Sequence, residues 1–230
     1  TNLGWDSNLE ALVTHPLGPF SDHRLALNYS SYALEFIDDN GDTVSTMHLE
    51  GANHIAIINW LGEEGMRLEL GELYVFDLHY ELPYEDVDED FHFPEPDYNE
   101  IQRLADMRTI AKQAIEHVIE VHGEEGESRV WPHHFDTGAV INLESQSPRS
   151  IGLGLAIPDS MIDGYYLYVS AWSADGSFQL DCMPALEIGE WMHPDWNGAV
   201  LPADEVNEKI AMTFFFHAVR EANERHEVSA

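Results

Sequence analysis

Strand-like segments on both sides of a long helical segment restrict the folds that this chain can adopt. Over residues 98–122 apolar side chains recur at helical spacing, and Gly123 follows as a stop signal. A second long helix is predicted from Asp204, as its N-cap, to Asn223, and a short helix over residues 52–61. Because these helices interrupt runs of strands, the order predicts an α+β fold with a mostly antiparallel sheet, two long helices and one short helix.

Turn residues separate the predicted strands into pairs. Asn40-Gly41 lies between two runs of apolar residues, which is a strong hairpin signal. Two further pairs are expected: residues 135–143 with 151–157, and residues 165–172 with 178–182.

Other segments are less regular. Residues 66–82 predict one or two strands, and residues 83–97, rich in carboxylates and prolines, predict a loop that could act as a lid. Gly152 and Gly154 alternate with apolar residues, which predicts a strand against which another element packs closely.

The net charge of the chain indicates the kind of solvent to which the protein is adapted. Forty-three Asp and Glu against ten Lys and Arg give a formal charge of −33 on 230 residues. Salt relieves the resulting repulsion by shortening the Debye length to ~3 Å at 1 M, so we expect adaptation to high salt. Because 44% of the residues are hydrophobic, the chain is expected to fold rather than stay disordered. We expect one domain over residues 1–230, with coarse halves 1–123 and 124–230.

The composition also limits the classes of molecule that the chain is expected to bind. Cys182 is the single cysteine, which excludes an intrachain disulfide and fits a cytoplasmic location. Nucleic acid is not expected as a partner because no segment clusters Lys and Arg, and an anionic membrane surface is disfavoured by the same sign of charge. No apolar run approaches the length of a membrane span. A small-molecule ligand or a second copy of the chain remains as partner.

Two short segments combine Trp, His, Pro and Asp, and they supply the candidate site. The first is Trp131-Pro132-His133-His134-Phe135-Asp136, and the second is Trp191-Met192-His193-Pro194-Asp195-Trp196. Imidazole and carboxylate together form a common ligand set for divalent metals. The candidate metal ligands are His133, His134, Asp136 and His193, with zinc or manganese as the candidate ion and with Trp131 and Trp191 flanking a bound ligand.

Several interpretations of these segments stay open. The first is a module that binds a small ligand or a divalent cation. The second is a metal-dependent hydrolase in which a metal lowers the pKa of its bound water and Asp195 is the general base. The third is a homo-oligomeric interaction protein without catalysis. A fourth, purely structural interpretation is rigid packing of Pro, His and aromatic residues, because no family-specific metal spacing accompanies them.

The order of segments resembles an uncharacterised family of bacterial conserved proteins. The likeness rests on five pieces: Phe36-Ile37-Asp38, the helix over 101–118, Phe135-Asp136, the Tyr-rich strand 165–168, and Leu201-Pro202 before the last helix. Trp131-Pro132-His133-His134 stands where the family carries a Trp-Gly-Ser spacing. The resemblance implies the topology of strands and helices, and it implies no activity because the family has none assigned.

Overall fold

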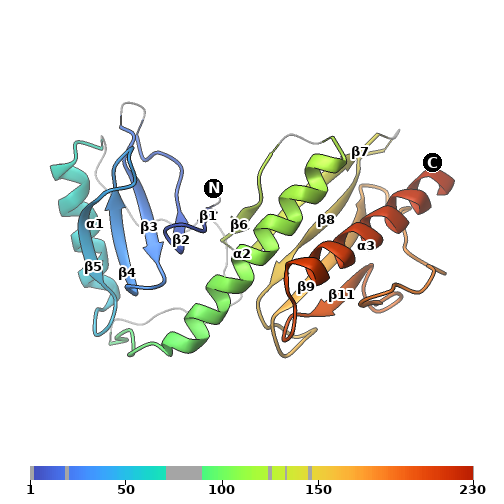
Figure 1. The fold of residues 1–230 in the computed structure, drawn as a ribbon. Helices are drawn as coiled ribbons and strands as arrows, with labels where there is room; N and C mark the ends of the chain where they lie inside the picture. Colours follow the sequence, from blue (N-terminus) through green and yellow to red (C-terminus); the bar gives the residue numbers. More distant parts are fainter. Residues whose placement is uncertain are drawn as a thin grey trace. The chain divides into compact units, whose positions relative to one another are not determined.

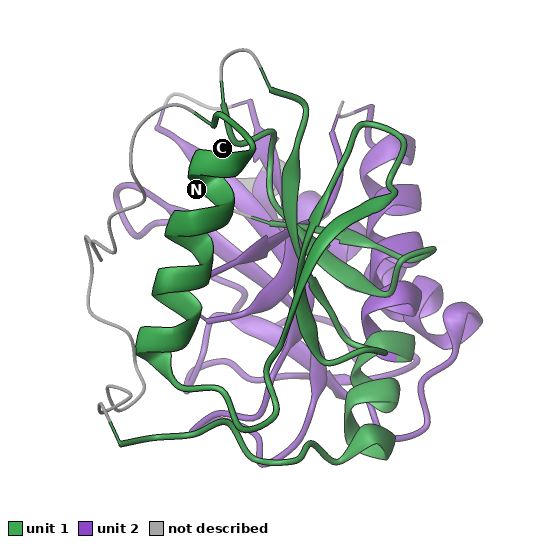
Figure 2. Cartoon of the chain, turned by 90° about the vertical axis from the view of Figure 1, so that its left-hand side faces the viewer, with its two compact units in different colours: residues 1–106 green, residues 107–230 purple. Residues whose placement is uncertain are grey.

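The computed structural model of the chain describes residues 3–18, 21–70, 90–123, 126–132, 134–144 and 147–229 (Figure 1). These residues form two antiparallel sheets and three helices, two of them long, so the predicted α+β class is confirmed. The chain divides into two compact units, Thr1–Asp106 and Met107–Ala230, which Figure 2 colours separately. The expected single domain with halves 1–123 and 124–230 stays a prediction.

Unit 1 holds a sheet whose five strands lie in sequence order. They are β1 (Gly4–Asp6), β2 (Ala11–Val13), β3 (Arg24–Asn28), β4 (Ala33–Ile37) and β5 (Thr43–His48). Helix α1 (His54–Arg67) follows, with Asn53 as its N-cap, whose Oδ1 accepts a hydrogen bond of 2.9 Å from the backbone of Ala56.

The predicted hairpin in unit 1 is confirmed, whereas the predicted end of the short helix is wrong. Strands β4 and β5 pair antiparallel, and Gly41 between them has a φ of +84°, which favours glycine. Helix α1 continues through Gly62 to Arg67, because a glycine ends a helix only where it adopts the left-handed conformation. Here that conformation belongs to Glu69, at a φ of +53°.

The segment after α1 is described in part. Residues 71–82 of the predicted strands and residues 83–89 of the predicted loop lie outside the described residues. Residues 90–97 contain no helix or strand apart from an isolated bridge between His92 and Asn53.

Unit 2 holds a sheet in the order β10-β11-β9-β8-β7-β6, with every neighbouring pair antiparallel. Its strands are β6 (Arg129–Trp131), β7 (Asp136–Leu143), β8 (Arg149–Ala156), β9 (Tyr166–Ser173), β10 (Glu190–Trp191) and β11 (Gly198–Pro202). Helix α2 (Tyr98–Val121) runs from unit 1 into unit 2, and α3 (Glu208–Ser229) follows the sheet.

One face of this second sheet packs against α2 and α3 (Figure 1). The buried cluster joins Ile151 and Leu153 of β8 to Val118 of α2 and to Phe214 and Ala218 of α3. Burying a side chain of the size of Ile or Phe stabilises the fold by about 1.5–3 kcal/mol. Since side chains alternate across a strand, every second residue of β7, β8 and β9 faces the other side of the sheet.

Two predictions about unit 2 need correction. Helix α3 begins at Glu208 rather than after Asp204, because Asn207 caps it by accepting a hydrogen bond from the backbone of Ile210 at 3.1 Å. Residues 178–182 form no strand. The backbone N–H of Phe178 donates to Ser173 Oγ and that of Leu180 donates to Asn197 Oδ1, so side chains replace the ladder bonds that a strand would make.

No helix within the described ranges has the length and apolar character that crossing a membrane requires.

Candidate functional site

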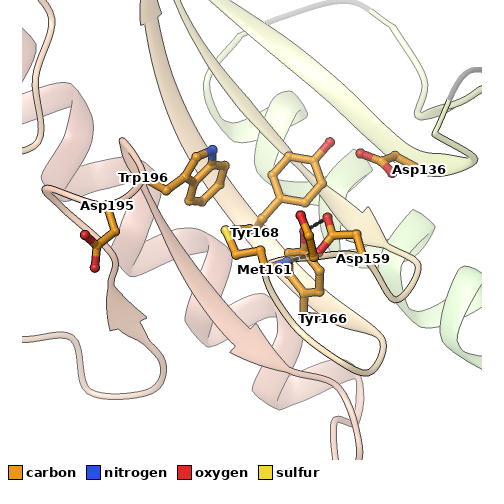
Figure 3. Close-up of a pocket in the computed structure, with 8 residues that line it drawn as sticks. Asp136, Asp159, Met161, Tyr166, Tyr168, Asp195 and Trp196 are labelled. Carbon is orange, nitrogen blue, oxygen red and sulfur yellow. Dashed lines mark hydrogen bonds between the residues drawn. The ribbon is translucent and has the colours of Figure 1, made fainter. Parts of the chain in front are cut away.

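A cavity of about 530 Å³ opens on the face of the second sheet that α2 and α3 leave uncovered (Figure 3). It belongs entirely to unit 2. Of the described residues, eight line it: Asp136, Asp159, Ser160, Met161, Tyr166, Tyr168, Asp195 and Trp196. Three are carboxylates and three are large aromatic side chains, so the lining is both charged and apolar.

Glycines in the sheet make room for Tyr168. Tyr168 on β9 pairs with Gly154 on β8, which in turn pairs with Gly138 on β7. A Cβ built on Gly154 would lie 2.8 Å from both Cζ and Oη of Tyr168, and one on Gly138 would lie 3.1 Å from Oη. The phenol ring therefore lies across the two glycines, which confirms the close packing predicted from Gly152 and Gly154.

A third glycine, Gly198, places Trp196 in the same way. A Cβ on Gly198 would overlap the six-membered ring of Trp196, so the indole lies against this glycine. The centroids of Trp196 and Tyr168 are 6.3 Å apart with the rings at 79°, and those of Tyr168 and Tyr166 are 6.5 Å apart. Three aromatic rings thus follow one another along the cavity.

Asn197 anchors the loop that carries Asp195 and Trp196. Its Nδ2 donates to the carbonyl oxygens of Ala171 and Phe178, at 2.8 and 2.9 Å, and its Oδ1 accepts from the backbone of Leu180 at 2.8 Å. These three hydrogen bonds tie the loop to β9 and to the segment after it, so the position of Trp196 is set by contacts far away in the sequence.

Asp159 is held ionised by its surroundings. Its Oδ2 accepts a hydrogen bond of 2.7 Å from the Tyr166 hydroxyl, and its Oδ1 accepts bonds of 2.8 and 3.2 Å from the backbone N–H groups of Met161 and Ile162. Burial disfavours the charged carboxylate, but these hydrogen bonds and the nearby His134 outweigh it, and the pKa of Asp159 falls below its ordinary value.

The two tyrosines remain neutral donors. Burial, followed by the hydrogen bond and the charge of Asp159, raises the pKa of Tyr166. Burial, followed by the charge and the hydrogen bond of Asp136, raises the pKa of Tyr168. Each phenol is therefore paired with one carboxylate, and neither is a candidate base at ordinary pH.

Arg108 on α2 positions the strand that carries Asp136. It is 1% exposed, and its guanidinium donates to Thr137 Oγ1 at 2.5 Å and to the Phe135 carbonyl at 3.0 Å. These two residues flank Asp136, and Phe135 has a φ of +57°, a conformation that costs energy for a residue with a side chain. The buried guanidinium holds this strained backbone and so fixes the start of β7.

The structure brings part of the predicted site together. Asp136 and Asp195, one from each Trp/His/Asp segment, both line the cavity. Figure 3 shows the Asp195 carboxylate pointing away from the tyrosines, so Asp195 stands at the rim. His134 does not line the cavity, although its charge lowers the pKa of Asp159.

The remaining predicted residues lie elsewhere or are not described. Trp131 lies in β6, and Trp191 in β10 donates from Nε1 to the Pro184 carbonyl at 2.9 Å; neither lines the cavity. His193 acts on Asp181, whose pKa is lowered first by a hydrogen bond from Arg225 and more weakly by His193. His133 lies outside the described residues.

Among the residues that the structure describes, no three His, Cys, Asp or Glu side chains gather as a metal-binding group. Since the predicted ligand set includes His133, the proposed zinc or manganese site stays a prediction.

The sequence did not indicate three important lining residues, Asp159, Tyr166 and Tyr168, and of the second candidate segment it favoured Trp191 rather than Trp196 as the flanking ring. The alternation of Tyr166 and Tyr168, together with Gly152-x-Gly154 in the preceding strand, was the available signal. Large rings opposite glycines in neighbouring strands indicate that aromatic side chains lie flat on the sheet. Asp159 carried no such signal, because its role depends on a hydrogen bond made after folding.

No family model matches the chain, and neither a curated protein nor a solved structure matches it. The resemblance to an uncharacterised bacterial family therefore stays a prediction.

Proposed function

We propose that this protein binds a small molecule in the cavity of unit 2. One observation carries the proposal: two segments about sixty residues apart in the sequence supply Asp136, Asp195 and Trp196 to a single cavity that Tyr166 and Tyr168 complete. The volume of about 530 Å³ lies within the range of roughly 300–1,000 Å³ that is typical of ligand pockets. Aromatic walls with a few fixed polar groups are also typical of such pockets.

The polar groups are arranged for recognition. The Tyr166 hydroxyl donates to Asp159 at 2.7 Å, the charge of Asp136 acts on Tyr168, and Asn197 and Arg108 hold the loop and the strand behind them. Side chains fixed in this way lose little conformational freedom when a ligand arrives, which favours binding.

The test is a screen by thermal shift with a variant that blocks the cavity. The panel contains organic cations, organic anions, sugars and nucleosides at constant ionic strength. Ser160, an exposed lining residue, is replaced by Trp to fill the cavity, and Ala174, an exposed turn residue outside the lining, is replaced by Trp as a control.

At least one class of probe is expected to raise the melting temperature of the wild type and of Ala174→Trp but not of Ser160→Trp. A panel without any shift in the wild type, or a shift of equal size in Ser160→Trp, would contradict the proposal.

The alternatives have separate tests. Near-stoichiometric zinc or manganese in protein purified without a His tag would support the metal site, and hydrolysis of an ester or phosphoester that disappears in His134→Ala would support the hydrolase. A mass that grows with concentration in concentrated KCl would support the homo-oligomer.

A further inference from the structure

The charges around the cavity select the sign of its ligand. Among the described residues of the lining, every ionisable side chain apart from the two tyrosines is an aspartate, and none is Lys, Arg or His. The raised pKa values keep Tyr166 and Tyr168 neutral, while the lowered pKa keeps Asp159 ionised. An anionic ligand would meet several carboxylates and no cationic side chain among the described lining residues, with His134 outside the lining as the nearby basic group, whereas a cation would be attracted by each carboxylate.

The aromatic rings favour the same sign. The face of an indole or a phenol is electron-rich, and a cation within about 6 Å of the ring centroid is stabilised by it. Trp196 and Tyr168 stand at 79° with centroids 6.3 Å apart, so they form two adjoining walls of a corner, and Tyr166 follows 6.5 Å beyond Tyr168. One ammonium group in this corner lies within reach of two rings.

The spacing of the carboxylates indicates a cation larger than a metal ion. Figure 3 shows Asp136 and Asp195 on opposite sides of the rings of Tyr168 and Trp196, with Asp159 beside Tyr166. Asp136 and Asp159 therefore lie on one side of the aromatic corner and Asp195 stands at the rim on the other, so the carboxylates do not converge on one point. A methylated ammonium group spreads its charge over several carbons and matches apolar walls with surrounding negative charge.

Resting on the proposed function, we infer that the ligand is a small organic cation whose methylated ammonium group occupies the corner between Tyr168 and Trp196. Choline is a probe of this class. Its neutral isostere 3,3-dimethylbutan-1-ol has the same shape with carbon in place of the charged nitrogen, so the two compounds separate charge from shape.

The experiment compares the two probes by isothermal titration in about 2 M KCl, where screening removes unspecific attraction to the anionic surface. Wild type is expected to bind choline at least about tenfold more tightly than the alcohol. Trp196→Leu, which removes the ring, is expected to weaken choline binding by about tenfold, whereas Trp196→Phe, which keeps an aromatic face, is expected to weaken it by less than about threefold. Ser160→Trp is expected to abolish it.

Each outcome separates the inference from the proposed function. If the wild type binds choline and the alcohol with equal affinity, and Ser160→Trp binds neither, the inference of a cationic ligand is overturned. The proposed binding of a small molecule in this cavity then still stands. Choline binding that persists in Ser160→Trp would overturn the cation site in this cavity. If neither probe binds, the inference of a cationic ligand is overturned. The wider panel of compounds then tests the proposed function. The comparison of probes on the wild type stands even where Trp196→Leu fails to fold.

Discussion

Replacing Gly154 by Ala tests the packing on which the cavity depends. The new Cβ would lie 2.7 Å from the Thr137 carbonyl oxygen and 2.8 Å from Cζ and Oη of Tyr168. Ordinary contacts begin at 3.4 Å, so each atom would have to move by about 0.6 Å or more. The carbonyl belongs to the neighbouring strand and yields little, and the ring of Tyr168 must therefore leave its place over the glycine.

The expected cost follows from two opposing terms. Overpacking of this kind destabilises a core by about 1–3 kcal/mol. Alanine recovers roughly 0.5–1 kcal/mol because it loses less backbone entropy than glycine on folding. The net loss in the free energy of unfolding is therefore about 1–2 kcal/mol, together with loss of the contact between Tyr168 and Asp136.

Urea unfolding in 2 M KCl, followed by near-ultraviolet circular dichroism, measures both the stability and the aromatic environment. Gly164→Ala is the matched control, since a Cβ there meets no atom within 4 Å and the φ of Gly164 is not positive. The control is expected to change stability by less than about 0.5 kcal/mol. Equal stability of Gly154→Ala and wild type, with an unchanged aromatic signal, would refute the placement of Tyr168 on the glycines.

Three further outcomes are expected. Arg108→Met should lower the free energy of unfolding by about 2–4 kcal/mol, because the Phe135 carbonyl and Thr137 lose a buried donor, while Arg103→Met on the surface should cost less than about 1 kcal/mol; similar costs for both would contradict the positioning role. The melting temperature should rise by roughly 10 °C between 0.1 and 2 M KCl as repulsion within the −33 charge is screened, and a flat trend would count against salt adaptation. Folding raises the pKa of Tyr166 and Tyr168, so the stability that their protons provide is complete below the unfolded pKa near 10 and is lost as the pH rises beyond it. Tyr166→Phe should therefore flatten the fall in the free energy of unfolding above about pH 10. An unchanged slope would refute the raised pKa of Tyr166.

Local sequence patterns predicted most of the helices and strands, but few of the side chains to which backbone groups donate hydrogen bonds. The helical spacing over residues 98–122 corresponds to α2, and the runs around Asn40-Gly41 correspond to β4 and β5. In contrast, residues 178–182 have a strand-like composition, but Ser173 and Asn197 satisfy their backbone. No local pattern indicates that a side chain seventeen residues away will accept the bond of Leu180.

The residues of the candidate site likewise fall into those that the sequence predicted and those that it did not. Asp136 and Asp195 were predicted because His, Pro and Trp surround them in the sequence, and both line the cavity. The same neighbours favour Trp131 and Trp191, but the cavity instead contains Trp196, whose position depends on Gly198. The neighbours of a residue in the chain indicate its chemical type, whereas its orientation depends on the strand beside it.

The sequence by itself determined the acidic composition, the α+β class and the location of the long helices, because charge and hydrophobic periodicity can be read directly from the chain. Only the tertiary structure decided that Tyr168 lies over Gly154 and that two distant aspartates share one cavity. The order of strands around β9 produces both results, since antiparallel pairing brings residues from separate segments to the same face of a sheet.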